Sequence, residues 1–410
     1  MLLRLSFWVT LTLATLVYWR LPSRVRSGFL GVVSFLFLFY MAGGDGDAVG
    51  VIGALTPDRL ALLMLLVWTL LSFRFARTSV KDDPWSRVRK NALILGLLGY
   101  LGYFKYFPEI FSALFSHDMG ALFLPVGISY YTFKLIHFNI EAGRGKFSDC
   151  TFGDFLAYVT LFPAFTAGPI ERFDHFQRNR SEEWSWDLFL EGTTRLAHGL
   201  IKKVVIGGVL LGNLIAAQGL GDVPIGDASS LQVWSWLFLQ YLWVYIDFSA
   251  YTDIAIGASL LFGIRLVENF NWPIFAENIG GFWKRWHMSL AAWCQAYIYL
   301  PAIGWSRNPY IAVFLTFFVI GLWHGAGVNW VLWGLYHGLG VAAYLTWAKY
   351  KRRTGRHRRP RLYNIHGRIL TNFFVAASFA LTMPLQGSGS GSELQWAITA
   401  FLKALSFGLF

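Results

Sequence analysis

Long runs of mainly apolar residues alternate with short polar segments along this chain. Four such runs occupy residues 2–19, 27–44, 61–73 and 91–104. A helix needs roughly 20 apolar residues to cross about 30 Å of hydrocarbon, and in lipid it satisfies its own backbone hydrogen bonds. The pattern predicts an all-α, polytopic membrane protein with about 11 spans in one domain, residues 1–410. The first run lacks a small-residue cleavage site, so we expect a retained helix and not a signal peptide.

Composition and charge support a membrane protein. Hydrophobic residues make up 55% of the chain and charged residues 14%, and the mean hydropathy is +0.47. The net charge of +12 would suggest nucleic-acid binding in a soluble protein, but here basic residues gather in the loops 74–90 and 349–361. Because cytoplasmic loops are rich in Lys and Arg, both loops are predicted to face the cytoplasm, with no nucleic-acid partner. The predicted location is the cell (cytoplasmic) membrane, crossed many times.

Some segments depart from the regular alternation. Residues 151–173 contain Pro163, Gly168 and Pro169. They predict a broken or re-entrant helix, because irregular backbone at membrane depth must lie inside protein or beside water. The run GSGSGS at 387–392 fits either an artificial linker or a short outside loop. Two cysteines far apart and no His-x-x-x-His spacing predict neither a disulfide framework nor a metal site.

Ionisable residues within apolar runs are candidates for function. Asp247 and Asp253 are six residues apart in a predicted helix. That spacing places them on different faces, so we expect capping or ion-pair roles more than a carboxylate acid/base pair. A further apolar run, 124–146, carries polar side chains at Tyr130, Tyr131, Lys134 and His137.

Two histidine segments stand out among these runs. In GFWKRWHMSLAAW (281–293), Lys284, Arg285 and His287 lie between tryptophans and could either line a polar interior or snorkel to the interface. In GLWHGAG (321–327), three glycines surround His324, which predicts a break or a close approach of the backbone. His337 follows 13 residues later, on what we expect to be the next helix, and its default role is that of a packed, hydrogen-bonded side chain.

A polar, histidine-containing interior suits two classes of membrane protein. One is an enzyme acting inside the membrane, in which a neutral imidazole serves as a base. The other is a transporter or channel without bond chemistry, for which inverted repeats would be the sequence signature. The sequence shows no such repeat.

Four blocks resemble the membrane-bound O-acyltransferases, and specifically their bacterial branch for cell-envelope polymers. The blocks are LPVGISYYTF, FPAFTAGPIERF, DFSAYTDIAIGASLLFGIRLVENFNWPIF continuing to FWKRWHMSLAAW, and GLWHGAGVNWVLWGLYHG, all within residues 124–340. FTAGPIERF and RWHMSL look like the component that passes D-alanine to teichoic acids. DFSAYTDIAIG and VENFNWP look like the alginate-type O-acetylation component.

The resemblance implies a ring of tilted helices around a central tunnel. It makes His324 the expected catalytic histidine and His287 the second catalytic-site histidine. The expected substrate or tunnel-lining residues are Arg285, Trp286, Trp323, Asp247 and Tyr130.

The resemblance also implies the reaction. A short acyl group, acetyl or D-alanyl, would move from a cytoplasmic thioester to a hydroxyl acceptor of a polysaccharide or teichoic acid outside the membrane. The donor would be a phosphopantetheine carrier protein or acyl-coenzyme A, with no tightly bound cofactor. A separate extracytoplasmic protein would complete delivery. After RWHMSL the sequence reads AAWCQAYIYLP, where the family has an arginine and an acidic residue, so the acyl group and the donor contacts stay open.

Overall fold

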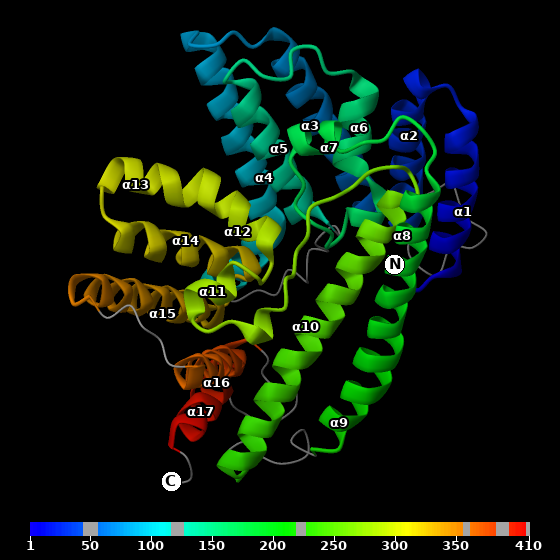
Figure 1. Ribbon diagram of the computed structural model, residues 1–410. Coiled ribbons are helices and arrows are strands. Elements are labelled where there is room, and N and C mark those ends of the chain that lie inside the picture. Colours follow the sequence, from blue (N-terminus) through cyan, green and yellow to red (C-terminus); the bar gives the residue numbers. More distant parts are fainter. Residues whose placement is uncertain (44–55, 116–126, 219–226, 356–360, 383–392, 407–410) are drawn as a thin grey trace. The chain divides into compact units, whose positions relative to one another are not determined.

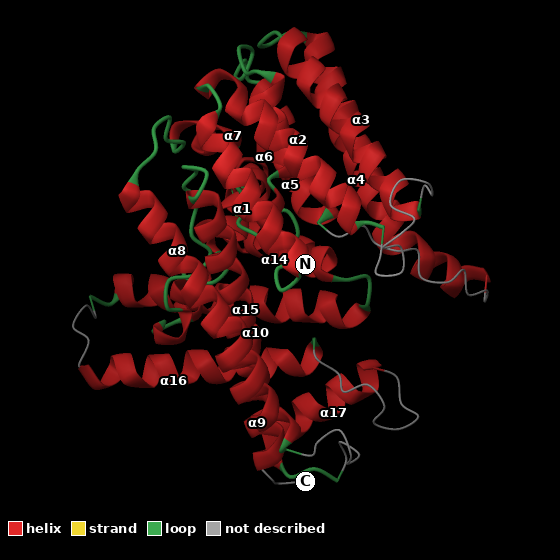
Figure 2. Ribbon diagram, turned by 90° about the vertical axis from the view of Figure 1, so that its right-hand side faces the viewer, coloured by secondary structure: helices red, strands yellow, loops and turns green. Residues whose placement is uncertain are grey.

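The computed structural model describes residues 1–43, 56–115, 127–218, 227–355, 361–382 and 393–406. In these residues the regular structure is helical (Figure 2). An isolated antiparallel bridge between Arg180 and Ile264 is the exception among the described residues. The chain forms two compact units, residues 1–198 with 251–267, and residues 199–250 with 268–410. The glycine-serine run at 387–392 lies outside the described residues. The prediction of a single functional domain stays a prediction.

The first unit is built from the N-terminal helices together with the last turns of α10. Its elements include a short 3₁₀ turn, η1 (Phe162–Ala164). The helices, coloured blue to green in Figure 1, are α1 (Leu5–Arg20), α2 (Ser23–Met41), α3 (Pro57–Thr78), α4 (Pro84–Phe115), α5 (Ile128–Ala142), α6 (Phe152–Thr160), α7 (Phe173–Arg178) and α8 (Trp186–Leu200).

The second unit holds most of the C-terminal half. It contains two π-helical segments, η2 (Ile201–Leu211) and η5 (Gln295–Tyr299), and two 3₁₀ turns, η4 (Pro273–Phe275) and η6 (Phe379–Leu381). Its α-helices are α9 (Gly212–Ala216), most of α10 (Ser230–Leu260), α11 (Ile279–Trp283), α12 (Met288–Cys294), α13 (Leu300–Ser306), α14 (Pro309–His324), α15 (Val328–Arg353), α16 (Arg361–Ser378) and α17 (Glu393–Ser406).

Three helical segments of the described chain are long and apolar enough to cross a membrane, namely Ser23–Met41, Asp58–Thr78 and Trp186–Ala216. Phe152–Ala164 and Pro309–His324 are shorter apolar helices. The all-α, membrane-spanning prediction is therefore confirmed, whereas the count of about 11 spans stays a prediction.

Several helix ends follow from local sequence. Thr56 accepts a hydrogen bond from the Arg59 amide (3.3 Å) at the start of α3, and Asn308 accepts one from the Tyr310 amide (2.9 Å) at the start of α14. In both helices a proline occupies the first turn, where no amide hydrogen is needed.

The break expected within residues 151–173 is present. Helix α6 ends at Thr160, because Pro163 cannot continue a helix and restricts the residue before it. The 3₁₀ turn η1 follows, and α7 begins only at Phe173. The expected break is confirmed, while its depth in a membrane stays a prediction.

Small residues allow α2 and α6 to pack closely. Ser27, Gly31 and Ser34 form a buried stripe on α2. Thr160 donates to the Gly31 carbonyl (3.3 Å), and the Ser34 hydroxyl accepts from the Phe162 amide (3.3 Å). A Cβ at Gly31 would lie 2.9 Å from the Ala157 backbone nitrogen, which is closer than real Cβ atoms come. Small residues at helix crossings let two backbones approach, as is common in membrane proteins.

We expect Gly31→Ala to lower stability by about 1 to 3 kcal/mol, because the added methyl group must push α6 away. Gly28→Ala is the matched control on the same helix, since a Cβ there meets nothing within 4 Å. Alanine should be neutral or stabilising at that site by up to about 1 kcal/mol. Thermal unfolding of both variants in detergent tests this, and equal midpoints would contradict the close crossing.

Candidate active site

His287 lies in a tight turn between α11 and α12 and not within a helix. Its φ is +45°, a left-handed conformation that non-glycine residues adopt rarely. Its side chain is 3% exposed. The turn directs the imidazole into the second unit, and the interfacial-snorkel interpretation of this residue is therefore wrong for His287.

Asn269 holds His287 in this conformation. Its side-chain oxygen lies 3.3 Å from His287 Nδ1 and accepts a hydrogen bond from the Ser289 hydroxyl (2.5 Å). The Met288 amide donates to the Asn269 carbonyl (2.9 Å). Asn269 is fully buried, and the sequence pattern did not mark it as a site residue, although it lies in the VENFNWP block. A polar residue in an aromatic-rich loop was the available signal.

His324 is the last residue of α14. Gly325 ends the helix in an extended conformation, and α15 begins at Val328. The His324 ring stacks on Trp330 at 4.9 Å between centroids and meets the edge of Trp333 at 5.1 Å. Its side chain is exposed, whereas that of His287 is buried.

Trp323 lies between the two histidines. Its ring centroid is 6.3 Å from that of His287 and 4.7 Å from that of His324. The second unit therefore brings together three residues predicted from the sequence. Phe248 closes the other side of His287, with ring centroids 4.8 Å apart at a nearly perpendicular angle.

Glycines set the position of His324 by letting α14 and α15 approach. A Cβ at Gly321 would lie 2.5 Å from the Trp330 carbonyl oxygen. A Cβ at Gly334 on α15 would likewise lie too close to the Phe317 carbonyl oxygen. The close approach expected around His324 is confirmed, and it explains why glycines occur in a helix where each costs about 1 kcal/mol relative to alanine.

Arg285 and Trp286 have different environments. Arg285 is half-buried and donates to the Asn271 carbonyl (3.3 Å), while its own carbonyl accepts from the Asn271 amide (3.0 Å). Trp286 packs among aromatic rings, at 5.2 Å from Phe270 and 5.4 Å from Phe282. Both residues brace the turn that carries His287. The neighbouring Lys284 is exposed.

The two aspartates form ion pairs, as their spacing indicated. In the second unit, Asp247 pairs with Lys203 in the π-helical segment η2. In the first unit, Asp253 lies 3.0 Å from Arg195 of α8. An acid/base pair made of both carboxylates is not formed. Tyr130, half-buried on α5, belongs to the first unit, and its tunnel-lining role stays a prediction.

His337 is packed but not hydrogen-bonded. It lies on α15, 1% exposed, with the rings of Trp333 and Trp283 at 4.6 and 5.2 Å. Among the described residues neither of its ring nitrogens has a hydrogen-bond partner. The packing expected for His337 is confirmed, and the hydrogen bond is not.

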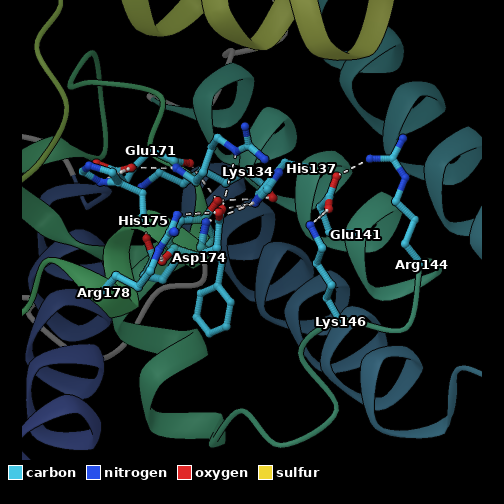
Figure 3. Close-up of polar contacts among 12 residues, drawn as sticks. Lys134, His137, Glu141, Arg144, Lys146, Glu171, Asp174, His175 and Arg178 are labelled. Carbon is cyan, nitrogen blue, oxygen red and sulfur yellow. Dashed lines mark hydrogen bonds and ion pairs between the residues drawn. The ribbon is translucent and has the colours of Figure 1, made fainter. Parts of the chain in front are cut away.

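A second polar network lies in the first unit, around the block FPAFTAGPIERF (Figure 3). Buried Glu171 accepts hydrogen bonds from the Arg172 amide (2.8 Å) and the Val267 amide (2.9 Å), and His175 Nδ1 lies 3.0 Å from its carboxylate. Buried Lys134 donates to the Tyr158 carbonyl (3.1 Å). The Val267 bond attaches the segment after the helix break to the loop that follows α10, and the Lys134 bond joins α5 to α6. They support a structural role for Glu171.

The Glu171 carboxylate raises the pKa of His175, which lies beyond the apolar segment on α7. A raised folded-state pKa stabilises the fold when the imidazole is protonated. That contribution should be complete below about pH 6.5 and disappear as the pH rises through the higher folded-state value. We expect the thermal midpoint of the wild type to fall more between about pH 6 and pH 8 than that of His175→Gln. If the thermal midpoints of the two proteins changed by the same amount over this pH range, the linkage would be ruled out.

Asn269→Ala should lower the free energy of unfolding by about 1 to 3 kcal/mol, because it leaves the buried His287 and Ser289 groups without their shared acceptor. Asn271→Ala is the control, since that side chain lies in the same block and is exposed. Thermal unfolding of the two variants gives the comparison. Equal midpoints would mean that Asn269 does not hold the turn.

Comparison with known proteins places this site in a family. The model of the membrane-bound O-acyltransferase family matches residues 55–386. The probable alginate O-acetylase AlgI of Pseudomonas aeruginosa is 35% identical over 267 residues, covering 63% of this chain and 49% of that protein. The chain spans about half the length of that relative.

Two other relatives act on different polymers according to their names. The teichoic acid D-alanyltransferase of Bacillus subtilis is 29% identical over 243 residues, covering 56% of this chain and 60% of that protein. The peptidoglycan O-acetyltransferase of Helicobacter pylori is 29% identical over 323 residues, covering 69% and 60%. The family match covers most of the chain and includes both histidine segments. The chain belongs to the membrane-bound O-acyltransferase family.

Proposed function

We propose that this protein transfers a short acyl group, acetyl or D-alanyl, from a cytoplasmic thioester to a hydroxyl acceptor of a cell-envelope or exported polymer outside the membrane. The observation that carries the proposal is the meeting of His287 and His324 around the Trp323 ring. Both histidines lie in blocks that resemble the family's histidine motifs, and the family match spans them. The named activities of the relatives, O-acetylation and D-alanylation, supply the two acyl groups.

In this mechanism His324 is the general base. Its exposed imidazole takes the proton from the acceptor hydroxyl, and the oxygen attacks the thioester carbonyl carbon. A positioned general base supplies about 10² to 10⁴ in rate. The carbon–sulfur bond then breaks, and the thiolate leaves with the proton that His324 returns. Exposure suits this role, because both substrates must reach the ring.

His287 and Trp323 act beside the base. Buried groups that donate hydrogen bonds to the developing oxyanion stabilise the transition state. The Asn269 side chain fixes the His287 ring orientation, and the Trp323 ring lies between the two imidazoles. We assign these residues to holding the acceptor or the thioester oxygen, with Arg285, Trp286 and Asp247 supporting the surrounding wall. Tyr130 is assigned to the tunnel on the resemblance alone.

The proposal includes the membrane arrangement and the partners. About 11 spans around a tunnel, within a single functional domain of residues 1–410 in the cytoplasmic membrane, would let the donor enter from the face that carries loops 74–90 and 349–361. The donor is a phosphopantetheine carrier protein or acyl-coenzyme A. A separate extracytoplasmic protein would deliver the group to the final polymer, since short loops give little surface for grasping one.

We expect His324→Ala to lower acyl transfer by at least about 10²-fold, because it removes the proposed general base. Glutamine at this position should not rescue, because it forms hydrogen bonds but cannot take a proton. The measurement is transfer of radiolabelled acyl groups by purified protein in vesicles, with donor inside and acceptor outside.

His198→Ala serves as the control in the same assay, since this histidine is exposed on α8 and lies outside the site. All variants must insert and purify as the same species. Near-equal rates for wild type and His324→Ala would remove His324 from the mechanism. Solute flux without any acyl transfer by the wild type would favour the transporter class instead.

A further inference from the structure

The first unit contains a pocket that no residue of the histidine blocks lines. Its volume is about 770 Å³, within the size range of ligand sites. It lies where α1 ends and α2 begins, against the start of α6 and residues 180–182. The lining residues that matter most are Arg24, Val25, Arg26, Gly28 and Arg180.

Arginines give this pocket a positive charge that the protein only partly neutralises. Arg180 is paired with Asp154 at 2.5 Å. Arg26 donates instead to three backbone carbonyls, those of Leu21 (2.9 Å), Glu182 (2.6 Å) and Trp19 (3.4 Å). Among the described residues no carboxylate pairs with Arg26. Its guanidinium also lies 4.8 Å from the centre of the Trp19 ring, so the group is fixed in place without a carboxylate of the described chain that neutralises it.

The neighbouring charges add to this effect. Arg24 lines the same pocket and is exposed, and the Glu182 side chain, also lining it, is exposed as well. The remaining carboxylate, that of Asp154, is already bound by Arg180 and by the Thr151 hydroxyl (2.7 Å). The two positive charges of Arg24 and Arg26 therefore outnumber the single negative charge of Glu182, the lining carboxylate that Arg180 does not bind.

The start of α2 also faces this pocket. Ser23, the first residue of α2, and Arg24 line it, and the capping position is Pro22, which makes no side-chain capping bond. The N-terminus of a helix carries partial positive charge and amide groups that favour phosphate. Arginine guanidinium groups are well suited to phosphate oxygens. The chemistry of the pocket is that of a phosphate site.

Both α1 and α2, which contribute residues to the pocket, also carry exposed apolar side chains. Val25 lines the pocket and is 44% exposed, and on α1 the side chains of Leu16 and Val17 are 51% and 42% exposed. Leu13, Val9 and Leu5 extend this exposed stripe at helical spacing. In a membrane protein such a stripe faces acyl chains. A ligand that offers a phosphate to the arginines and acyl chains to this stripe is a phospholipid.

We propose that this pocket binds the phosphate headgroup of an anionic phospholipid, with its acyl chains along the exposed stripe of α1. Basic pockets beside membrane helices bind the anionic headgroups of lipids in this way. The lipid would attach the α1–α2 corner to the bilayer, and its role does not depend on the acyl-transfer reaction.

The test is lipid retention by the full-length protein, purified in detergent and measured by native mass spectrometry with added phosphatidylglycerol. Arg26→Gln should lower retention by about tenfold or more, because it removes a charge-assisted contact with phosphate. Arg353→Gln is the control: this arginine is exposed in the last turn of α15, outside the pocket, and its loss should leave retention unchanged.

A second variant avoids the risk of misfolding. Gly28→Glu places a carboxylate beside the pocket where a Cβ meets nothing within 4 Å, and glutamate favours a helix more than glycine does. It should lower phosphatidylglycerol retention while the protein stays monodisperse. Higher salt should also weaken retention by the wild type, because the phosphate contact is ionic.

Three results would overturn the proposal. The first is equal phosphatidylglycerol retention by Arg26→Gln and Arg353→Gln. The second is equal retention of zwitterionic phosphatidylethanolamine and phosphatidylglycerol by the wild type. The third is Arg26-dependent binding of coenzyme A that displaces phosphatidylglycerol, which would assign the pocket to the phosphate of a soluble donor.

Discussion

The close approach of α14 and α15 is the contact on which the candidate site depends. Glycines at positions 321 and 334 let each helix reach the other's backbone carbonyl groups. Because α14 then ends at His324 and α15 begins four residues later, the Trp330 and Trp333 rings fall beside the imidazole. Larger side chains at the crossing would separate the helices and move these rings.

The second half of the site depends on a buried polar turn. His287 adopts a left-handed conformation, which costs energy for a residue with a Cβ and persists only where its surroundings hold it. Asn269 and Ser289 provide that support through hydrogen bonds inside an aromatic environment, where an unmade bond would be expensive. One histidine is thus buried and fixed while the other is open, an arrangement that suits a positioning group and a base.

Charges elsewhere in the chain follow the same physical rule. Asp247 and Asp253 each have a basic partner in their own unit, and Glu171 receives two backbone amides. Arg26 and Lys134 are instead held by backbone carbonyl groups. Arg26 differs from Lys134 in that it is only partly buried and lines a pocket together with Arg24 and Arg180.

The sequence by itself determined the helical membrane class, the helix break near Pro163, a break or close backbone approach around His324, and capping or ion-pair roles for Asp247 and Asp253 in preference to an acid/base pair. These follow from local rules, because apolar length, proline, glycine and residue spacing act within a few turns of one helix. Only the tertiary structure decided that Lys203 and Arg195 are the partners, that Asn269 holds His287, and that His324 is exposed. Those features join residues far apart in the chain or depend on how neighbouring helices cover a side chain, and a pattern along one segment contains neither.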